Sequence, residues 1–150
     1  MENGGSAQAK RGSDGKFRAR CGGEVMIVGI GVDMVEIARI RGVYERHGER
    51  FLERVLTPRE REYCLRHKDP APRLAGRWAA KEAAMKALGT GLSNGVAWKD
   101  FEILPDPKGK PVLELYGEAA RIAKSLGASR AHVTITHSRD AAFAQAILEG

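Results

Sequence analysis

The run Trp-Ala-Ala-Lys-Glu-Ala-Ala-Met-Lys at residues 78–86 constrains the fold most, because almost all of its residues are strong helix formers. At about 100° per residue, Trp78, Glu82 and Lys86 share one side of the predicted helix. The alanines between them keep the remaining surface slim, so that neighbouring backbone can approach closely. The run therefore predicts a closely packed helix on which a carboxylate and an ammonium point the same way.

A glycine-rich segment, Leu-Gly-Thr-Gly-Leu-Ser-Asn-Gly, follows this helix at residues 88–95. Its backbone N–H groups are free to bind an anion. An isolated Glu-to-Lys pair on a helix contributes only about 0.3 to 0.5 kcal/mol and is usually a solvated surface pair. The alanines and the glycine segment instead favour phosphate and metal chemistry around Glu82 and Lys86.

Residues 26–33 alternate as a β-strand. One side of this strand is apolar and consists of Val28, Ile30 and Val32, whereas the other side consists of Gly29, Gly31 and Asp33. Because the glycines have no side chains to pack, something must come close to the backbone beside Asp33. A ligand, a second strand and a helix all meet this requirement. Taken alone, Asp33 also suits the N-cap of a helix at residues 36–44, but Glu82 supplies a second carboxylate and favours a metal site.

The two motifs together resemble the signature motifs of the holo-acyl-carrier-protein synthases, which are small 4'-phosphopantetheinyl transferases. Gly-Ile-Gly-Val-Asp at 29–33 comes first, and the run at 78–86 comes second. Further matches occur in the family's order at Arg39, 51–57, 89–91, 109–111 and 134–138. The resemblance covers Met26 to the end of the chain.

This resemblance implies a magnesium-dependent transferase of fatty acid biosynthesis and lipid metabolism. Such an enzyme moves the 4'-phosphopantetheine arm of coenzyme A onto a serine of apo-acyl carrier protein and releases adenosine 3',5'-bisphosphate. The resemblance also implies a homotrimer in the cytoplasm, with sites shared between neighbouring subunits.

Three residues are expected to be catalytic by this resemblance. Asp33 and Glu82 bind magnesium together with the pyrophosphate of coenzyme A, and both are hard oxygen ligands that suit this ion. Lys86 neutralises the charge that grows on phosphate oxygens. Glu82 also polarises a metal-bound water that accepts the serine proton, with a direct base role for a carboxylate as the alternative.

The resemblance further assigns residues that contact coenzyme A and the carrier protein. The expected coenzyme A contacts are Lys81, Lys86, Gly89, Thr90, Gly91 and His137. Lys81 has the plain alternative of a solvated helix charge, and His137 is expected to bind a phosphate or the nucleotide rather than to transfer a proton. Arg39, on the outward side of the first predicted helix, is expected to dock the acidic carrier protein.

The remaining pattern predicts an α+β fold, with one long helix and shorter helices packed on a mostly antiparallel sheet. Thr57 and Glu60 form a predicted capping box around Pro58, which opens a helix. The other predicted helices cover residues 36–44, 73–88 and 118–126, and the other predicted strands cover 98–103, 112–116, 131–136 and 141–148.

Composition and charge restrict the class of protein. The chain has 150 residues, of which 43% are hydrophobic, and no apolar run approaches the roughly 20 residues of a membrane span. Its net charge of +6 suits nucleic acids, acidic proteins and polyphosphates equally. With 6% aromatic residues, no stacking platform and no finger spacing, we expect no nucleic acid partner. A non-catalytic nucleotide- or acyl-chain-binding protein is the remaining alternative.

The sequence divides into a basic leader and one domain. Residues 1–24 are rich in Gly, Ser and basic side chains without apolar periodicity, so we expect disorder there and a single transferase domain over 25–150. A native extension, a cloning remnant and an upstream start codon all fit the leader. Cys21 and Cys64 are too few and too far apart for a zinc cluster or a disulfide framework, and we expect free thiols in a reducing compartment.

Overall fold

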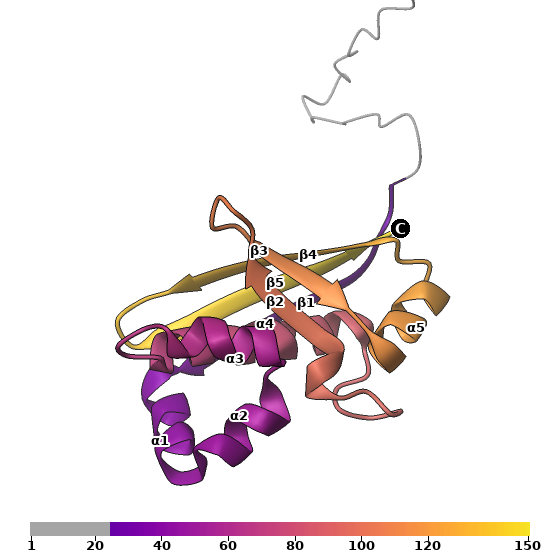
Figure 1. Ribbon diagram of the computed structural model, residues 1–150. Helices are drawn as coiled ribbons and strands as arrows, with labels where there is room; N and C mark the ends of the chain where they lie inside the picture. Colours follow the sequence, from indigo (N-terminus) through magenta and orange to yellow (C-terminus); the bar gives the residue numbers. More distant parts are fainter. Residues whose placement is uncertain (1–24) are drawn as a thin grey trace, which may run out of the picture.

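One long helix, α4 (Ala71–Leu88), lies across one face of a three-stranded antiparallel sheet (Figure 1). The computed structural model describes residues 25–150, so the expectations for the leader and for Cys21 lie outside the described residues. The strand order is β1-β5-β4, and the strands are β1 (Ile27–Glu36), β5 (Ala141–Glu149) and β4 (Arg130–His137). β5 occupies the centre, paired with β1 on one side and β4 on the other.

A separate two-stranded antiparallel sheet is formed by β2 (Phe101–Pro105) and β3 (Pro111–Leu115). The predicted turn at 105–111 joins these two strands, with Gly109 at φ 88°. Residues 98–100 form a single 3-10 turn, η1 (Trp98–Asp100), so the predicted strand begins three residues later than expected. The predicted α+β fold with antiparallel strands is confirmed, with the strands divided between two sheets.

Four shorter α-helices complete the fold of residues 25–150. They are α1 (Ile37–His47), α2 (Glu49–Val55), α3 (Pro58–Leu65) and α5 (Gly117–Ser125). The capping box that begins α3 is confirmed, since the Glu60 carboxylate accepts from the Thr57 N–H at 2.9 Å and the Thr57 hydroxyl accepts from the Glu60 N–H at 3.3 Å. α2 had no counterpart among the predicted helices. Within residues 25–150, no helix combines the length and the apolar character that crossing a membrane requires.

The glycine side of β1 packs directly on α4. A Cβ added to Gly29 would overlap the carbonyl oxygen of Ala87, and one added to Gly31 would overlap that of Ala83. The alanines of α4 are fully or almost fully buried in this contact and in the rest of the core. A ligand, a second strand and a helix were the candidates for the group that lies against the glycines of β1. The structure shows that it is the helix α4.

The apolar side of β1 faces away from α4 and is uncovered in the single chain. Ile30, Val32 and Met34 are 56%, 45% and 69% exposed. On the adjoining strand, Phe143 pairs with Met34 and is 39% exposed, and Ile147 pairs with Ile30. These five residues, called the open sheet face below, lie on the side of the sheet opposite the core, where Gln145 pairs with Val32 between Phe143 and Ile147.

Candidate functional site

Asp33 and Lys86 join the strand β1 to the last turn of α4. The Lys86 ammonium lies 2.9 Å from a carboxylate oxygen of Asp33 and donates a second hydrogen bond of 2.9 Å to the carbonyl of Val32. Asp33 lies in the interior of β1, and the helix that follows is capped at Glu36 without a side-chain hydrogen bond. The N-cap interpretation of Asp33 is therefore wrong. Its carboxylate faces α4 because the glycine side of the strand does so.

Glu82 lies one turn before Lys86 and is partly buried. Burial raises the pKa of the Glu82 carboxyl, and the negative charge of Asp33 raises it further, whereas the positive charges of Lys86 and Arg39 lower it. The two carboxylates are thus close enough to repel each other. A cation held between them would relieve this repulsion.

The donor set at this position fits magnesium better than a metal with an all-protein cage. No group of three or more His, Cys, Asp or Glu side chains converges anywhere in the described residues 25–150. Magnesium is commonly held by one or two carboxylates and completes its shell with waters and substrate phosphates. Two carboxylates beside an ammonium satisfy this requirement, and Asp33 and Glu82 are the residues that would hold the ion.

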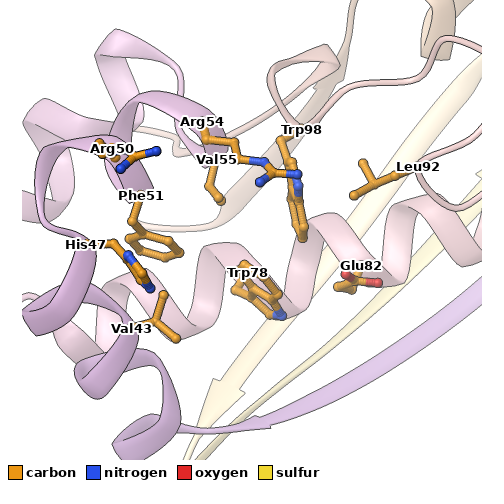
Figure 2. Close-up of a pocket in the computed structure, with 10 residues that line it drawn as sticks. All are labelled: Val43, His47, Arg50, Phe51, Arg54, Val55, Trp78, Glu82, Leu92 and Trp98. Carbon is orange, nitrogen blue, oxygen red and sulfur yellow. The ribbon is translucent and has the colours of Figure 1, made fainter.

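A groove of about 630 Å³ begins beside Glu82. Figure 2 shows aromatic side chains in its middle, with Val43 and His47 at one end and Glu82 and Leu92 at the other. Its remaining residues come from α2, α4 and η1, and they are Arg50, Phe51, Arg54, Val55, Trp78 and Trp98. The ring of Trp78 stacks on Phe51 with centroids 6.1 Å apart and lies 4.5 Å from Trp98. The groove therefore combines an apolar floor with a basic rim.

Sequence reasoning missed most of this groove. Trp78 shares the side of α4 that carries Glu82, as the four-residue spacing predicted. Arg50, Arg54 and Trp98 had no assigned role, although residues 51–57 matched a family segment. The sequence signal for this groove was the basic and aromatic composition of residues 50–54, just before the capping box.

The structure contradicts the expectation that Lys81 binds the cofactor. The Lys81 side chain is completely buried. Its ammonium lies 2.6 Å from the Glu60 carboxylate and donates to the carbonyls of Val55 at 2.7 Å and Trp98 at 3.0 Å. An ammonium has three N–H donors, and all three are occupied, so none is left for a phosphate. The alternative of a solvated helix charge is wrong for the same residue.

The glycine segment begins directly after the two catalytic candidates of α4. Gly89 ends the helix in a left-handed conformation with φ 77°, and Gly91 adopts φ 58°. Thr90 lies between them, with its backbone N–H bonded to the carbonyl of Met85. The glycine segment therefore lies at the end of α4, within one helical turn of Lys86 in sequence.

The two other predicted site residues, Arg39 and His137, lie at different distances from the carboxylates of Asp33 and Glu82. Arg39 is exposed on α1, and its positive charge lowers the pKa of the Glu82 carboxyl, against the larger effects of burial and Asp33. His137 ends β4, at the opposite edge of the sheet from β1, with β5 between them. At about 4.8 Å per strand, two strand spacings separate His137 from β1. One chain therefore brings Arg39 near the carboxylates but does not bring His137 there.

The sequence matches the model of one known protein family. The model of the 4'-phosphopantetheinyl transferase superfamily matches residues 29–145, which include Asp33, Glu82 and Lys86. The chain belongs to this family. The predicted resemblance is thereby confirmed.

Individual members of the family match this chain over almost the whole of their own length, and the solved structures share its fold. A holo-[acyl-carrier-protein] synthase of Photorhabdus laumondii is 53% identical over 123 residues, which cover 82% of this chain and 98% of that protein. The crystal structure of the holo-[acyl-carrier-protein] synthase of Neisseria meningitidis has a TM-score of 0.76 and 36% identity, covering 83% of this chain and all of that one. The Helicobacter pylori holo-[acyl-carrier-protein] synthase, solved in complex with coenzyme A, has a TM-score of 0.70 and 34% identity over 79% of this chain and 98% of that chain.

Proposed function

We propose that this chain is a holo-acyl-carrier-protein synthase, which transfers the 4'-phosphopantetheine arm of coenzyme A to a serine of apo-acyl carrier protein. The observation that carries the proposal is the meeting of Asp33, Glu82 and Lys86 beside the groove. The similarity to enzymes named for this reaction supports it, as does the coenzyme A complex of a relative.

The reaction displaces one half of a pyrophosphate. The serine oxygen of the carrier attacks the phosphorus that bears the pantetheine arm, and the bond from this phosphorus to the bridging oxygen breaks. Adenosine 3',5'-bisphosphate leaves with that oxygen, and the serine proton passes to Glu82, directly or through a water molecule. The protein's task is mainly to align the attacking hydroxyl and to neutralise charge on the phosphate oxygens.

Magnesium held by Asp33 and Glu82 supplies part of that neutralisation when it is bound. Lys86 supplies another part, because its ammonium is half exposed beside Asp33 and accessible to a phosphate oxygen. The backbone of Gly89, Thr90 and Gly91 continues from the same helix end and is our candidate for further phosphate contacts.

We also assign a homotrimeric assembly, in which a second copy covers the open sheet face. Monomeric proteins rarely expose large apolar patches, whereas Ile30, Val32 and Met34 are exposed at alternate positions along one strand. Val32 and Met34 flank Asp33 on β1 but point to the opposite side of this edge strand, so a neighbour bound there would reach the catalytic cluster of Asp33, Glu82 and Lys86 around the edge of the sheet. Such a neighbour could bring its own His137 to this cluster, whereas the His137 of the same chain lies two strands away.

The carrier protein is the macromolecular partner in this proposal. Arg39 is exposed and close to Glu82, so it suits the acidic surface of a carrier whose serine must reach the carboxylates. We assign the reaction to fatty acid biosynthesis in the cytoplasm. The buried free thiol of Cys64 is compatible with a reducing compartment.

A mass measurement tests the proposal directly. The protein is incubated with coenzyme A, magnesium and an apo-acyl carrier protein, and the carrier is then weighed by mass spectrometry. We expect the carrier to gain one phosphopantetheine group, and a carrier with alanine at the modified serine to gain none. Several apo-carriers left unmodified under these conditions would contradict the transferase function and favour a non-catalytic binding protein.

A further inference from the structure

Lys81 directly precedes Glu82 in α4, yet its side chain enters the interior of the protein. The carboxylate that receives it, Glu60, is also completely buried. Glu60 accepts from Lys81 at 2.6 Å and from the N–H groups of Thr57 at 2.9 Å and Ile103 at 2.7 Å. Among the described residues, no buried side-chain nitrogen or oxygen lacks a hydrogen-bond partner. The pair is therefore a fully satisfied polar centre between α3, α4 and β2.

Fold stability alone does not account for such a pair. Removing two charges from water costs several kcal/mol per ion, and apolar residues of similar volume are often equally stable or more stable in the same place. Burial accordingly lowers the pKa of Lys81, while the charge of Glu60 opposes that effect. The role of the pair is better indicated by the groups that accept the hydrogen bonds of the Lys81 ammonium.

The two carbonyls that Lys81 holds belong to residues that line the groove. Val55 is the last residue of α2, and Trp98 is the first residue of η1. The side chains of both line the groove beside Glu82 (Figure 2). Trp98 also lies 4.5 Å from Trp78, which projects from the same helix as Glu82. One ammonium thus joins two walls of the groove, drawn from separate elements, to the helix that carries the catalytic carboxylate.

We infer that Lys81, held in place by Glu60, is a positioning residue that fixes the walls of the groove relative to Glu82. This inference rests on the proposed transferase function. A displacement of about 1 Å in a reacting group can cost on the order of 100-fold in rate, so a tie of this kind has a measurable catalytic effect. Lys81 acts here through Val55 and Trp98 and does not contact the substrates.

The test uses a variant that removes the tie without leaving a buried charge. Lys81→Met alone leaves Glu60 unpaired and can prevent folding, so the informative variant combines Lys81→Met with Glu60→Gln. Both tryptophans of the chain, Trp78 and Trp98, belong to the groove, so intrinsic fluorescence reports on it selectively. We expect emission at longer wavelength, stronger quenching by acrylamide, and a loss of about tenfold or more in kcat/KM. The magnesium concentration for half-maximal activity should stay unchanged.

Thr57→Val is the matched control. The Thr57 hydroxyl belongs to the same buried network, since it donates to Glu102 at 2.6 Å and caps α3, but it does not bind either groove carbonyl. This variant should unfold at a lower temperature and keep the wild-type emission and kcat/KM. An equal loss of kcat/KM in Thr57→Val would overturn the inference, because the effect would then follow stability alone.

A folded double variant with wild-type emission and wild-type kcat/KM would also overturn the positioning role. If the double variant does not fold, Lys81→Arg keeps a positive charge opposite Glu60 and provides the second test. A guanidinium cannot reproduce the compact ammonium geometry, so we expect the same changes in fluorescence and kcat/KM, and their absence would overturn the inference. An inactive wild-type protein would contradict the proposed function, whereas the fluorescence comparison would still test the tie.

Discussion

Lys86 contacts Asp33 through a 2.9 Å ion pair and the adjacent Val32 carbonyl through a 2.9 Å hydrogen bond. The last turn of α4 is thereby attached to the interior of β1 at the point where the strand presents its carboxylate. Because Gly29 and Gly31 allow the helix to lie directly on the strand, this attachment places Glu82 close enough to Asp33 for the two charges to interact. Close packing and the candidate metal site are therefore consequences of the same contact.

Glu82→Gln should preserve the fold and remove most of the activity. An amide is a much poorer magnesium ligand than a carboxylate, and a lost metal contribution of several kcal/mol corresponds to a rate loss of about 100-fold or more. The raised pKa of Glu82 shows that folding disfavours its ionised form, so at neutral pH the variant should unfold at an equal or slightly higher temperature. Steady-state kinetics over a magnesium titration and a thermal melt measure both effects. Glu62→Gln, an exposed change on α3, is the control, and wild-type turnover in Glu82→Gln would remove Glu82 from the site.

Arg39→Glu should raise the KM for the carrier protein strongly and leave the KM for coenzyme A unchanged. The substitution replaces attraction to an acidic partner by repulsion, which slows and weakens association. Added salt should weaken carrier binding by the wild-type protein as well. Kinetics with each substrate varied in turn make the measurement, with Lys108→Glu in the exposed turn between β2 and β3 as a control of equal charge change. A defect confined to coenzyme A would contradict the docking role.

Gly31→Ala should destabilise the protein by about 1 to 3 kcal/mol, because the new methyl group overlaps the carbonyl of Ala83 and forces α4 away from β1. The movement would also separate Asp33 from Glu82 and lower activity. Gly42→Ala in α1 is the control, since its methyl group meets only the end of the Arg46 side chain and alanine is the better helix former. Urea denaturation of the two variants measures the difference, and equal stability of both would contradict the tight contact.

Ile30→Lys should break the proposed trimer by placing a charge in the centre of the open sheet face. We expect light scattering after size-exclusion chromatography to report a trimer for the wild-type chain and a monomer for the variant, with activity lost alongside. Leu65→Lys, at the end of α3, introduces the same charge at another exposed apolar residue and should remain trimeric. A monomeric and active wild-type protein would contradict the assembly.

Deleting residues 1–24 should leave activity and oligomeric state unchanged. These residues precede the family match, which begins at Gly29, and carry no apolar pattern. The measurement is kcat/KM and molar mass for the shortened and full-length chains side by side. Lost solubility or altered assembly in the shortened chain would show that the leader contributes to the folded protein.

The sequence by itself determined the local structure and the identity of the catalytic candidates. The helix formers at 78–86 form part of α4, Thr57 and Glu60 cap α3 as predicted, and Gly29 and Gly31 lie together on one side of β1, where another group comes close to the backbone. These features depend on backbone preference and on spacing within a few residues, so they can be deduced from neighbouring residues alone. The motif spacing also identified the family.

The tertiary structure alone decided which of the neighbouring charges on α4 is buried. Lys81 and Glu82 are adjacent and equally polar, so the helical pattern cannot tell which one enters the core. The answer depends on Glu60, Val55 and Trp98, which lie 17 or more residues away in sequence and supply the acceptors around Lys81. The same long-range packing brings the aromatic side chains of the groove together from three elements and leaves the apolar side of β1 uncovered. Contacts between distant segments are set by the whole fold and not by local preference.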